Sequence, residues 1–359
     1  MSTNLDRPYN DLPFLPPEKN LETAEILKAA IQANKSLAEL KGLAETIPNQ
    51  SIFVNTLSLK EAQYSSEIEN IITTSDDLYQ AYSLSDQKMN KDTKEVLQYR
   101  AALWKGYALL AENGLITTNL INSVQAVLIE NNAGIRTLPG TSLKNAKTGK
   151  TVYTPPVGED VLRDKLKNLE DYINEDSTVD PLIKLALIHY QFEAIHPYYD
   201  GNGRTGRILN VLYLTQQGLL GMPILYLSGY IIRNKEKYYN LLRNLTLNQD
   251  YDAWILYMLD CVRVSSTETI ITIKKIQNLM IETSALVKEK CPKIYSKELI
   301  DVLFQQPYCK IKFLEDAKIA KRKTASEYLY ELEKIGVLTA KKVGRERLFL
   351  NKSLLNLFS

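Results

Sequence analysis

The sequence has few of the residues that hold metal ions or cross-link small secreted domains. Its 359 residues include 3 cysteines and 2 histidines. The cysteines, Cys261, Cys291 and Cys309, are odd in number and lack the spacing of metal ligands, so they support neither a zinc site nor a cysteine nucleophile. The N-terminus also lacks the charged and then apolar run of a signal peptide. We therefore expect reduced thiols and a cytoplasmic location.

Long uninterrupted apolar runs are also missing. Residues 208–232 carry no charged side chain, but three glycines, two glutamines, Asn210 and Pro223 interrupt them. A membrane-spanning helix needs about 20 predominantly apolar residues. The segment is therefore expected to form two buried helices joined at residues 218–223, with no contact to a membrane.

What the chain does have is enough apolar content for packed cores and enough length for two or three units: 45% of its residues are hydrophobic. Helical patterns dominate. We expect an N-terminal helical region over residues 1–110, beginning with a Pro-rich arm, and a helical core with one hairpin over residues 115–260. A connecting helix over 262–288 should lead to a last unit over 290–359. From residue 286 onward, 16 Lys and Arg face 9 Asp and Glu, so the end of the chain is basic.

The most informative segment reads HPYYDGNGRTGR, residues 196–207, between two apolar helical patterns. Glycines on both sides of Asn202 allow a tight turn, so backbone N–H groups converge at the start of the second helix. Free N–H groups at a helix N-terminus form an anion-binding site. Arg204 and Arg207, three residues apart on one helical face, add positive charge.

Two further side chains in this segment suggest chemistry. Asp200 can hold a divalent cation beside phosphates, because hard cations prefer carboxylate oxygen. His196, at the preceding helix end, can accept a proton from an attacking hydroxyl. His189 lies inside the apolar pattern and is expected to be packed. A His-Pro helix end and a Gly-Asn-Gly turn can each be purely structural, but their density with Asp and two Arg favours phosphoryl or nucleotidyl transfer.

The segment resembles the signature of the Fic (filamentation induced by cAMP) family, H-x-F-x-[DE]-G-N-G-R-x-x-R, with Tyr198 in place of the usual Phe. The resemblance implies transfer of AMP from ATP to a hydroxyl side chain (Ser, Thr or Tyr) of a target protein. It assigns proton removal to His196 and Mg²⁺ binding to Asp200. It also implies that the α-phosphate lies on Asn202 and the loop N–H groups, with the arginines on the β- and γ-phosphates. The nucleotide-binding residues implied are Gly201, Asn202, Gly203, Arg204, Thr205, Gly206 and Arg207.

A second motif supports the same family. Residues 65–70, SSEIEN, resemble its inhibitory motif [ST]-x-x-x-E-[GN] through Ser65, Glu69 and Asn70. In relatives with this motif, the glutamate pairs with the second arginine, here Arg207, and blocks the γ-phosphate position. A carboxylate can replace the anion that an arginine otherwise binds. The alternative is an ordinary acidic stretch on a solvated helix face.

Two other segments fit the resemblance more loosely. Residues 134–157 predict a β-hairpin, with a turn at Asn145–Gly149 and a strand at Thr151–Tyr153. Family members hold an extended target segment on such a flap by strand addition; the alternative is a plain surface hairpin. A Tyr-rich segment, which borders the adenine pocket in the family, supplies Asn234, Tyr238 and Tyr239, although tyrosines at helical spacing also serve as simple packing.

The basic end of the chain predicts a different small domain. Thr324–Glu327 fits a capping box that opens a helix. Residues 338–350 then read as a hairpin with four basic residues at its tip: Lys341, Lys342, Arg345 and Arg347. The pattern resembles a winged helix-turn-helix domain, and leaves open whether its partner is DNA, a target protein or a second copy of the chain.

The sequence thus predicts a mainly α fold, with a Fic-type helical core, one β-hairpin flap and a small winged helix-turn-helix domain. The predicted function is an autoinhibited protein adenylyltransferase that uses ATP and Mg²⁺. Two alternatives remain: another reaction on the same fold, such as AMP removal or transfer of phosphate or phosphocholine, and a DNA-binding regulator that senses nucleotide.

Overall fold

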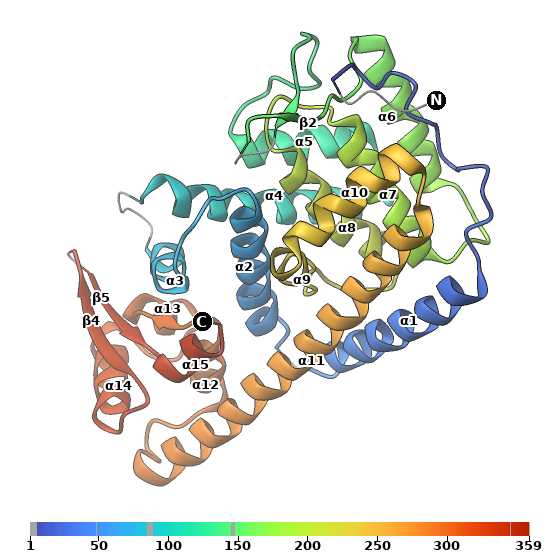
Figure 1. The fold of residues 1–359 in the computed structure, drawn as a ribbon. Helices are drawn as coiled ribbons and strands as arrows, with labels where there is room; N and C mark the ends of the chain where they lie inside the picture. The colour runs from blue at the N-terminus through green and yellow to red at the C-terminus, as the bar shows by residue number, and fades with distance from the viewer. Residues whose placement is uncertain (1–5, 48, 85–88, 145–147, 345, 359) are drawn as a thin grey trace.

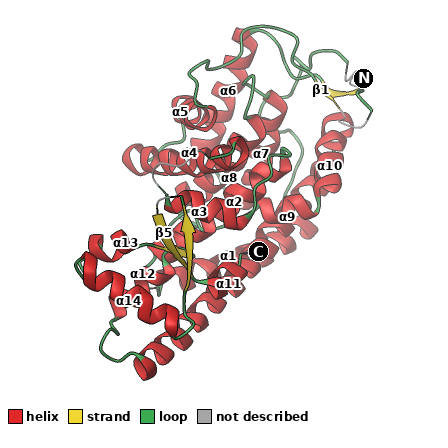
Figure 2. Cartoon of the chain, turned by 90° about the vertical axis from the view of Figure 1, so that its left-hand side faces the viewer, coloured by secondary structure: helices red, strands yellow, loops and turns green. Residues whose placement is uncertain are grey.

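Most of the chain folds into helices (Figures 1 and 2). The computed structural model describes residues 6–47, 49–84, 89–144, 148–344 and 346–358. The helices of the larger lobe are α1 (Ala24–Glu45), α2 (Ser51–Ile68), α3 (Ser75–Ser83), α4 (Lys91–Asn113), α5 (Thr118–Ile129), α6 (Glu159–Asn174), α7 (Pro181–Ile195), α8 (Asn202–Gln216), α9 (Ser228–Arg233) and α10 (Lys235–Asn248). The mainly α class is confirmed.

Helices α7 and α8 lie at the centre of this lobe. Helix α7 is apolar nearly all round, and 13 of its 15 residues are buried, as expected for a helix enclosed on every side. It packs against α6, α8 and α11 (Tyr251–Lys290), while α8 also contacts α2, α4 and α5. The loop between α7 and α8 is therefore fixed at both ends by buried helices.

The 40-residue helix α11 joins the two lobes and runs diagonally through Figure 1, with α1 packed along it. The predicted connecting helix over 262–288 begins too late, because α11 already begins at Tyr251. Asp250 caps α11 by accepting a hydrogen bond from the N–H of Ala253 at 3.3 Å. No glycine or proline interrupts the residues that follow, up to Lys290.

A second boundary also differs from the prediction. The two helices expected within residues 208–232 are α8 and the short α9, but the segment between them runs from 217 to 227 and is longer than the predicted joint at 218–223. Gly218 adopts φ +65°, a left-handed conformation that ends α8, and Pro223 lies within the irregular stretch.

The N-terminal arm, described from residue 6, carries no helix before α1 and lies on the larger lobe. The N–H of Tyr9 donates to the carbonyl of Thr154 at 3.0 Å. Lys165 donates to the carbonyl of Leu12, and Gln191 to that of Pro13. These contacts fasten the arm beside the hairpin and α7.

The predicted hairpin is present as β1 (Leu143–Lys144) and β2 (Thr151–Tyr153). The strands are antiparallel, with Leu143 opposite Tyr153 and an irregularity in the register. Residues 145–147 of the predicted turn, including Asn145, lie outside the described residues. The Tyr153 hydroxyl donates to the carbonyl of Ala194 at 2.7 Å, which fixes β2 beside the end of α7.

The smaller lobe contains α12 (Lys297–Phe304), β3 (Tyr308–Cys309), α13 (Ile311–Asp316), α14 (Arg322–Lys334), β4 (Thr339–Val343), β5 (Glu346–Leu350) and α15 (Lys352–Asn356). Its sheet order is β3–β5–β4, all antiparallel. Three helices followed by a hairpin match the expected winged-helix pattern. The predicted capping box is wrong, because α14 already begins at Arg322, after extended backbone at Lys321.

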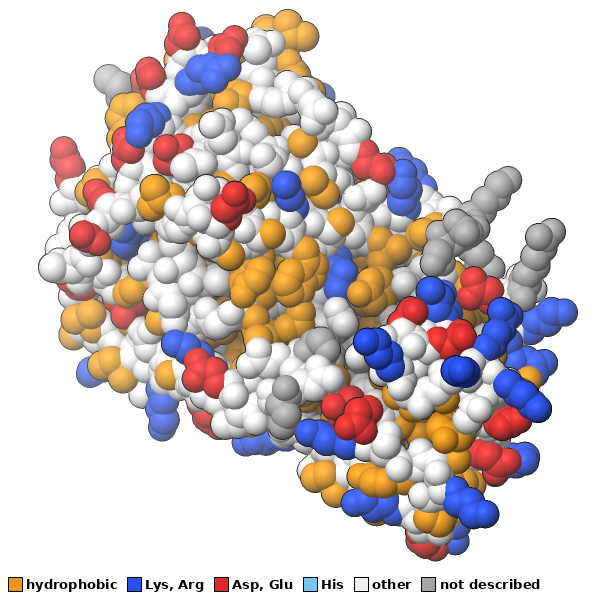
Figure 3. All heavy atoms as spheres, turned by 180° about the vertical axis from the view of Figure 1, so that it is seen from behind, with side chains coloured by type: hydrophobic (Ala, Val, Ile, Leu, Met, Phe, Trp, Pro, Cys, Tyr) orange, Lys and Arg blue, Asp and Glu red, His pale blue; other side chains and the backbone are white. Residues whose placement is uncertain are grey.

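The smaller lobe is also attached to the larger one through α3. Lys341, predicted at the hairpin tip, instead donates to Asp76 at 2.9 Å and to the Tyr308 hydroxyl at 3.1 Å. Its assignment to a free basic tip is therefore wrong. Lys342 is exposed, Arg347 donates to the Tyr330 hydroxyl, and Arg345 lies outside the described residues. Lys and Arg side chains gather on this side of the molecule, at the lower right of Figure 3.

Two further expectations concern the whole chain. Across the described ranges, no helix combines the length and the apolarity that crossing a membrane requires. All three cysteines are free thiols, and Cys261 and Cys309 are buried.

Candidate active site

The end of α7 fixes His196. Its N–H donates to the carbonyl of Phe192 at 3.0 Å, and its own carbonyl accepts from Arg136 Nε at 2.8 Å. Its φ of 49° lies in the left-handed region, which is uncommon for a residue other than glycine. Such backbone persists where surrounding contacts hold it, and it often marks a functional position. Here it ends the helix and points the chain into the loop.

The imidazole of His196 is poised as a base. Burial, followed by the nearby positive charge of Arg136, lowers the pKa of His196 to about 4. At neutral pH the ring is therefore uncharged and has a nitrogen free to accept a proton. An unperturbed histidine would be partly protonated at slightly acidic pH. The environment thus selects the form that a general base needs.

Asn202 holds the loop closed. Its side-chain oxygen accepts from the N–H of Tyr198, and its amide donates to the carbonyl of the same residue, both at 2.8 Å. The amide nitrogen carries two N–H donors, and one of them is used by the Tyr198 carbonyl, so the predicted contact of this side chain with a phosphate stays a prediction. The hydroxyl of Tyr198, the departure from the family pattern, donates to Asn122 at 2.7 Å in the core. The substitution is thereby accommodated.

The first turn of α8 presents free backbone donors. Gly201 turns the chain with φ +79°, and its own N–H donates to Asp200 at 2.6 Å. Within the described residues, the N–H groups of Asn202, Gly203 and Arg204 have no acceptor, as expected at a helix N-terminus. Together with the helix dipole they attract an anion.

The carboxylate of Glu69 lies beside this turn. A Cβ atom on Gly203 would collide with Glu69 Oε1 and lie 3.0 Å from Arg207 Nη1, so the glycine leaves room for the carboxylate next to α8. Among the described residues, the hydrogen-bond partner of this carboxylate is Arg207 and not an N–H group of the turn.

Arg207 is held by the same segment of α2. Its Nη2 donates to Glu69 Oε1 at 2.8 Å and to the carbonyl of Ser65 at 2.9 Å, and its Nε donates to Ser65 Oγ at 2.8 Å. The side chain is 1% exposed. Burial opposes its charge, but Glu69 holds the pKa of Arg207 above its usual range. All three of these hydrogen bonds go to Ser65 and Glu69, two residues of the inhibitory motif that the sequence predicts.

Glu69 itself lies at the C-cap of α2, and Asn70 follows with φ 62°, which ends the helix. Burial alone would raise the pKa of Glu69, but Arg207, with smaller effects of Arg204 and Lys235, lowers it below the usual value. The carboxylate is thus ionised and its side chain remains 36% exposed. The structure therefore brings the two predicted motifs together in one ion pair.

Arg204 is buried and paired with a residue that the sequence motifs did not indicate. Its Nη1 donates to Glu95 Oε2 at 3.0 Å, while Asp200 lies 4.0 Å away. Glu95 belongs to α4, so the pairing depends on the packing of α4 against α8. Thr205 and Gly206 face the interior rather than the loop surface, and the Thr205 hydroxyl is buried without a hydrogen bond.

Asp200 fits a role as a metal ligand that shares an ion with phosphates. Its side chain is 72% exposed and one oxygen accepts from Gly201, which leaves the other oxygen free. The described part of the chain contains no cluster of three or more His, Cys, Asp or Glu able to hold a metal ion. Mg²⁺ is often bound by one or two carboxylates plus substrate phosphates, so a single carboxylate is sufficient.

The predicted adenine residues divide into two groups. Tyr238 is 1% exposed, and its hydroxyl lies 2.8 Å from His189 Nε2. Tyr238 therefore packs in the core beside His189, which is the simple packing that the sequence left open for it, and His189 is packed as expected. Asn234 donates to the carbonyl of Tyr230 at 2.9 Å. Tyr239 is 44% exposed and lies within electrostatic reach of Glu69, so it borders the site with an accessible ring.

Two buried glutamates near Arg207 escaped the sequence reasoning. Glu193 lies in α7, and burial raises its pKa to about 7. Its Oε1 has no partner in the described structure and would be 2.5 Å from a Cβ atom on Gly206. The sequence did offer a signal for Glu193, since it is the one acidic residue of the largely apolar helix α7. Glu61 lies one turn before Ser65 on α2, and burial raises its pKa to about 7 as well.

Glu61 attaches the inhibitory helix to its surroundings. Its carboxyl accepts hydrogen bonds from the N–H and hydroxyl of Ser228, at 3.0 and 2.5 Å, and from the Tyr99 hydroxyl at 3.0 Å. Ser228 is the first residue of α9, and Tyr99 belongs to α4. Helix α2 is therefore fixed from both sides next to the site.

Three family models match successive parts of the chain. "Fic/DOC family N-terminal" covers residues 27–108, "Fic/DOC family" covers 115–214, and "Protein adenylyltransferase SoFic-like, C-terminal domain" covers 279–354. The fold is similar to that of a Fic family protein from Desulfovibrio desulfuricans G20, with a TM-score of 0.60 and 18% identity, covering 94% of this chain and 98% of that one. Fic-1 of Caenorhabditis elegans gives a TM-score of 0.53 at 22% identity, covering 70% and 74%.

Sequence relatives cover shorter stretches. A probable protein adenylyltransferase of Aquifex aeolicus is 36% identical over 91 residues, 25% of this chain and 26% of its own length. Protein adenylyltransferase fic-1 of C. elegans is 38% identical over 65 residues, 18% of this chain. The chain thus spans about a quarter or less of the length of these curated relatives. With the three family models in chain order, the shared fold and the motif at residues 196–207, the chain belongs to the Fic/DOC family.

Proposed function

We propose that this protein transfers AMP from ATP to a Ser, Thr or Tyr hydroxyl of a target protein, and that Glu69 keeps it nearly silent. The observation that carries the proposal is the anion site of α8, in which a carboxylate from α2 pairs with buried Arg207. The turn of α8 attracts an anion, and Glu69 already pairs with Arg207 beside it. These observations support a nucleotide phosphate as the ligand that competes with Glu69. The names of the relatives support AMP transfer.

The proposed reaction is an in-line displacement at the α-phosphorus. The target oxygen forms a bond to phosphorus, the bond to the bridging oxygen of the β-phosphate breaks, and pyrophosphate leaves. Neutral His196 takes the proton of the attacking hydroxyl, a role that its lowered pKa suits. Mg²⁺, held through Asp200, would neutralise charge on the phosphates and the leaving group.

The α8 turn would bind the phosphates. The free N–H groups of its first turn would donate to the α-phosphate, where negative charge develops. Arg207, freed from Glu69, would bind the γ-phosphate, and Arg204 the β-phosphate while Glu95 keeps its guanidinium oriented. Tyr239, the exposed aromatic side chain of the region, would contact the base.

The hairpin would hold the target. Tyr153 fixes strand β2 to the carbonyl of Ala194 at the end of α7, two residues before His196. An extended target segment added to this short edge would lie along the site through main-chain hydrogen bonds, which make few demands on sequence. The hairpin thus suits the role of a flap.

For domain organisation we propose units at residues 1–110, 115–260 and 290–359, joined by a helix. The first unit carries the inhibitory helix α2, and the second carries the catalytic loop. The exposed basic side chains of the third, Lys342 and Arg347, suit DNA phosphates or an acidic protein surface.

Intact-mass spectrometry tests the proposal. Purified protein is incubated with ATP and Mg²⁺, with Glu69→Gly to release the site. We expect a covalent AMP adduct that the additional change His196→Ala removes, because a general base contributes about 10² to 10⁴ in rate. ATP binding should persist in the double variant. An undiminished adduct there would exclude His196 from the mechanism.

A further inference from the structure

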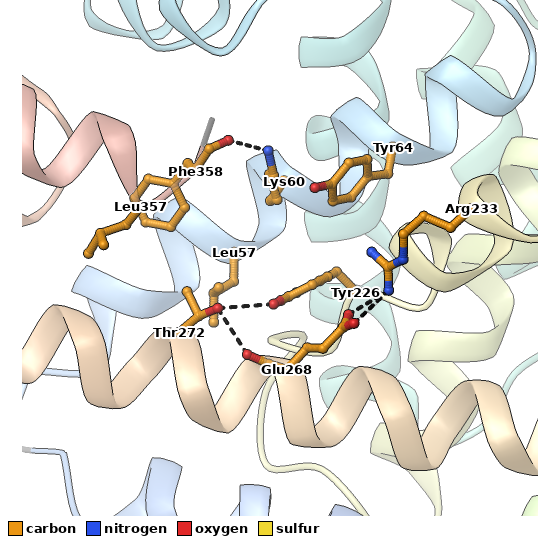
Figure 4. A pocket seen from close by; sticks show the side chains of 9 residues that line it. All are labelled: Leu57, Lys60, Tyr64, Tyr226, Arg233, Glu268, Thr272, Leu357 and Phe358. Atoms are coloured by element: carbon orange, nitrogen blue, oxygen red, sulfur yellow. Dashed lines mark hydrogen bonds and ion pairs between the residues drawn. The ribbon is translucent and has the colours of Figure 1, made fainter.

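A cavity lies on the side of α2 that faces away from the catalytic loop (Figure 4). Its volume is about 160 Å³, and it is enclosed by α2, α9, α11 and the C-terminal residues Leu357 and Phe358. The α2 residues that line it are Leu57, Lys60 and Tyr64. Lys60 and Glu69 are nine positions apart, which places them about 180° apart around a helix of 3.6 residues per turn. The cavity and the ATP site are therefore distinct.

Among the described residues that line the cavity, two are cationic, Lys60 and Arg233, and one is anionic, Glu268. Arg233 donates to both carboxylate oxygens of Glu268 at 2.7 Å, so these two residues neutralise each other. Lys60 has no carboxylate within ion-pair distance in the described parts of the chain. Its ammonium donates only to the carbonyl of Phe358 and lies 4.6 Å from the centre of the Tyr64 ring.

The surroundings of Lys60 disfavour its charged form. Desolvation lowers the pKa of Lys60 to about 8, although Glu67 opposes the shift. A buried cation is stable when it is paired, and costly when a neutral carbonyl is its main partner. An anion entering the cavity would be a stronger acceptor than that carbonyl, because hydrogen bonds between two charged groups are the stronger ones.

Aromatic and apolar side chains form one part of the cavity wall, beside the polar and charged side chains of Lys60, Arg233, Glu268 and Thr272. The rings of Tyr64 and Tyr226 have centres 6.5 Å apart and are tilted by 37°. Figure 4 shows both rings, with Leu57 between them and Phe358, around the space in front of Lys60. The Tyr64 hydroxyl makes no hydrogen bond to any described residue, which leaves it free to bind a ligand oxygen. Cavities of about 150 Å³ accommodate benzene.

We propose that this cavity binds a small organic anion that carries a carboxylate on a six-membered aromatic ring. The carboxylate would accept from Lys60 in place of the Phe358 carbonyl. The ring would pack against Leu57, Tyr226 and Phe358 in the space in front of Lys60, because the Tyr64 and Tyr226 rings already contact each other. The Tyr64 hydroxyl lies on the same side as the ammonium. The site is independent of the proposed AMP transfer, so each can fail without the other.

The test uses the full chain and benzoate as the probe, with binding followed by ligand-observed NMR and titration calorimetry. We expect saturable one-site binding of benzoate. Benzamide, which has the same ring and no charge, should bind about tenfold more weakly, as expected for the loss of one charge-assisted hydrogen bond. Inorganic phosphate, which has charge and no ring, should also bind more weakly than benzoate.

Variants separate the cavity from general surface binding. Lys60→Met keeps the aliphatic stem of the side chain. It should lower the affinity for benzoate to about that for benzamide and leave the affinity for benzamide unchanged. Lys105→Met, an exposed lysine on α4 outside the cavity, is the matched control and should change nothing. Leu357→Phe, which retains Lys60 and fills the space, should abolish binding of both probes.

The proposal is overturned if wild-type protein shows no saturable benzoate binding. It is equally overturned if folded Lys60→Met binds benzoate as tightly as Lys105→Met does, or if phosphate binds as tightly as benzoate. Should Lys60→Met fail to fold, the Leu357→Phe variant decides: unchanged benzoate binding there places the ligand elsewhere. Circular dichroism establishes folding for each variant.

Discussion

Removing the carboxylate of Glu69 should turn the enzyme on. In the structure this carboxylate lies beside Gly203 in the first turn of α8 and accepts a 2.8 Å hydrogen bond from Arg207. In the proposed mechanism, ATP places its γ-phosphate on Arg207 only after this bond is broken. Glu69→Gly removes that competition, and the two hydrogen bonds from Arg207 to Ser65 still orient the guanidinium.

The size of the effect follows from the bond that is lost. A hydrogen bond to a charged group contributes about 1.5–3 kcal/mol, and each 1.4 kcal/mol corresponds to a factor of ten. Because the Glu69 side chain is 36% exposed, solvent screens part of the attraction, and values at the lower end are expected. The rate of adenylylation at low ATP should therefore rise about tenfold. The free energy of unfolding should fall at the same time, since a buried Arg207 loses its counter-charge.

The assay is the initial rate of self-adenylylation, followed by intact-mass spectrometry at several ATP concentrations. Glu67→Gly is the matched control: it lies on the same helix, has no ion pair in the described structure and suffers the same loss of helix propensity. Glu69→Gln separates charge from bulk and should give intermediate activation. Equal rates for Glu69→Gly and Glu67→Gly would refute the inhibitory role of Glu69 and leave the transferase proposal intact.

Four further predictions follow from the site and from the smaller lobe. In the activated variant, the rate should stay constant as pH falls from 8 to about 5 and then decline near pH 4, because the lowered pKa of His196 keeps the base neutral above that value; a decline centred near pH 6.5 in the rate profile would contradict its buried environment. Asp200→Asn should reduce the rate in a way that added Mg²⁺ partly restores, whereas a lower melting temperature without rescue would indicate a structural role. Asp76→Asn should loosen the smaller lobe and increase hydrogen exchange in β3 and β4, while Asp77→Asn, which affects only the cap of α3, should not. If the smaller lobe binds DNA, neutralising Lys342 should reduce the slope of log affinity against log salt by about one.

The parts of the site that local sequence determines were predictable. The glycines of the loop, the helix end at His196 and the spacing of the arginines follow from residues within one dodecapeptide, whose backbone has few alternatives. The short hairpin was also found, because turn residues precede a β-branched strand. The meeting of Glu69 with Arg207 was predicted only through the resemblance, since 138 residues separate them.

The parts that depend on packing between distant helices were not predictable. Nothing local shows that Glu95 pairs with Arg204, or that Tyr238 turns its hydroxyl inward to His189. Lys341 looked like a free basic residue, since its partner Asp76 lies 265 positions away. Helix boundaries failed where several signals competed. The start of α14 is one example, because the Thr324 cap was overridden by extended backbone three residues earlier.

The central claim, transfer of AMP from ATP, is tested most directly by following the label of the nucleotide. The Glu69→Gly protein is incubated with Mg²⁺ and ATP that is labelled either at the α-phosphate or at the γ-phosphate, and covalent label is measured after denaturation. The account predicts that only the α-label becomes attached to protein hydroxyls, and that the added His196→Ala change abolishes it. Covalent γ-label would show phosphate transfer instead, and no covalent label from either nucleotide would contradict the account.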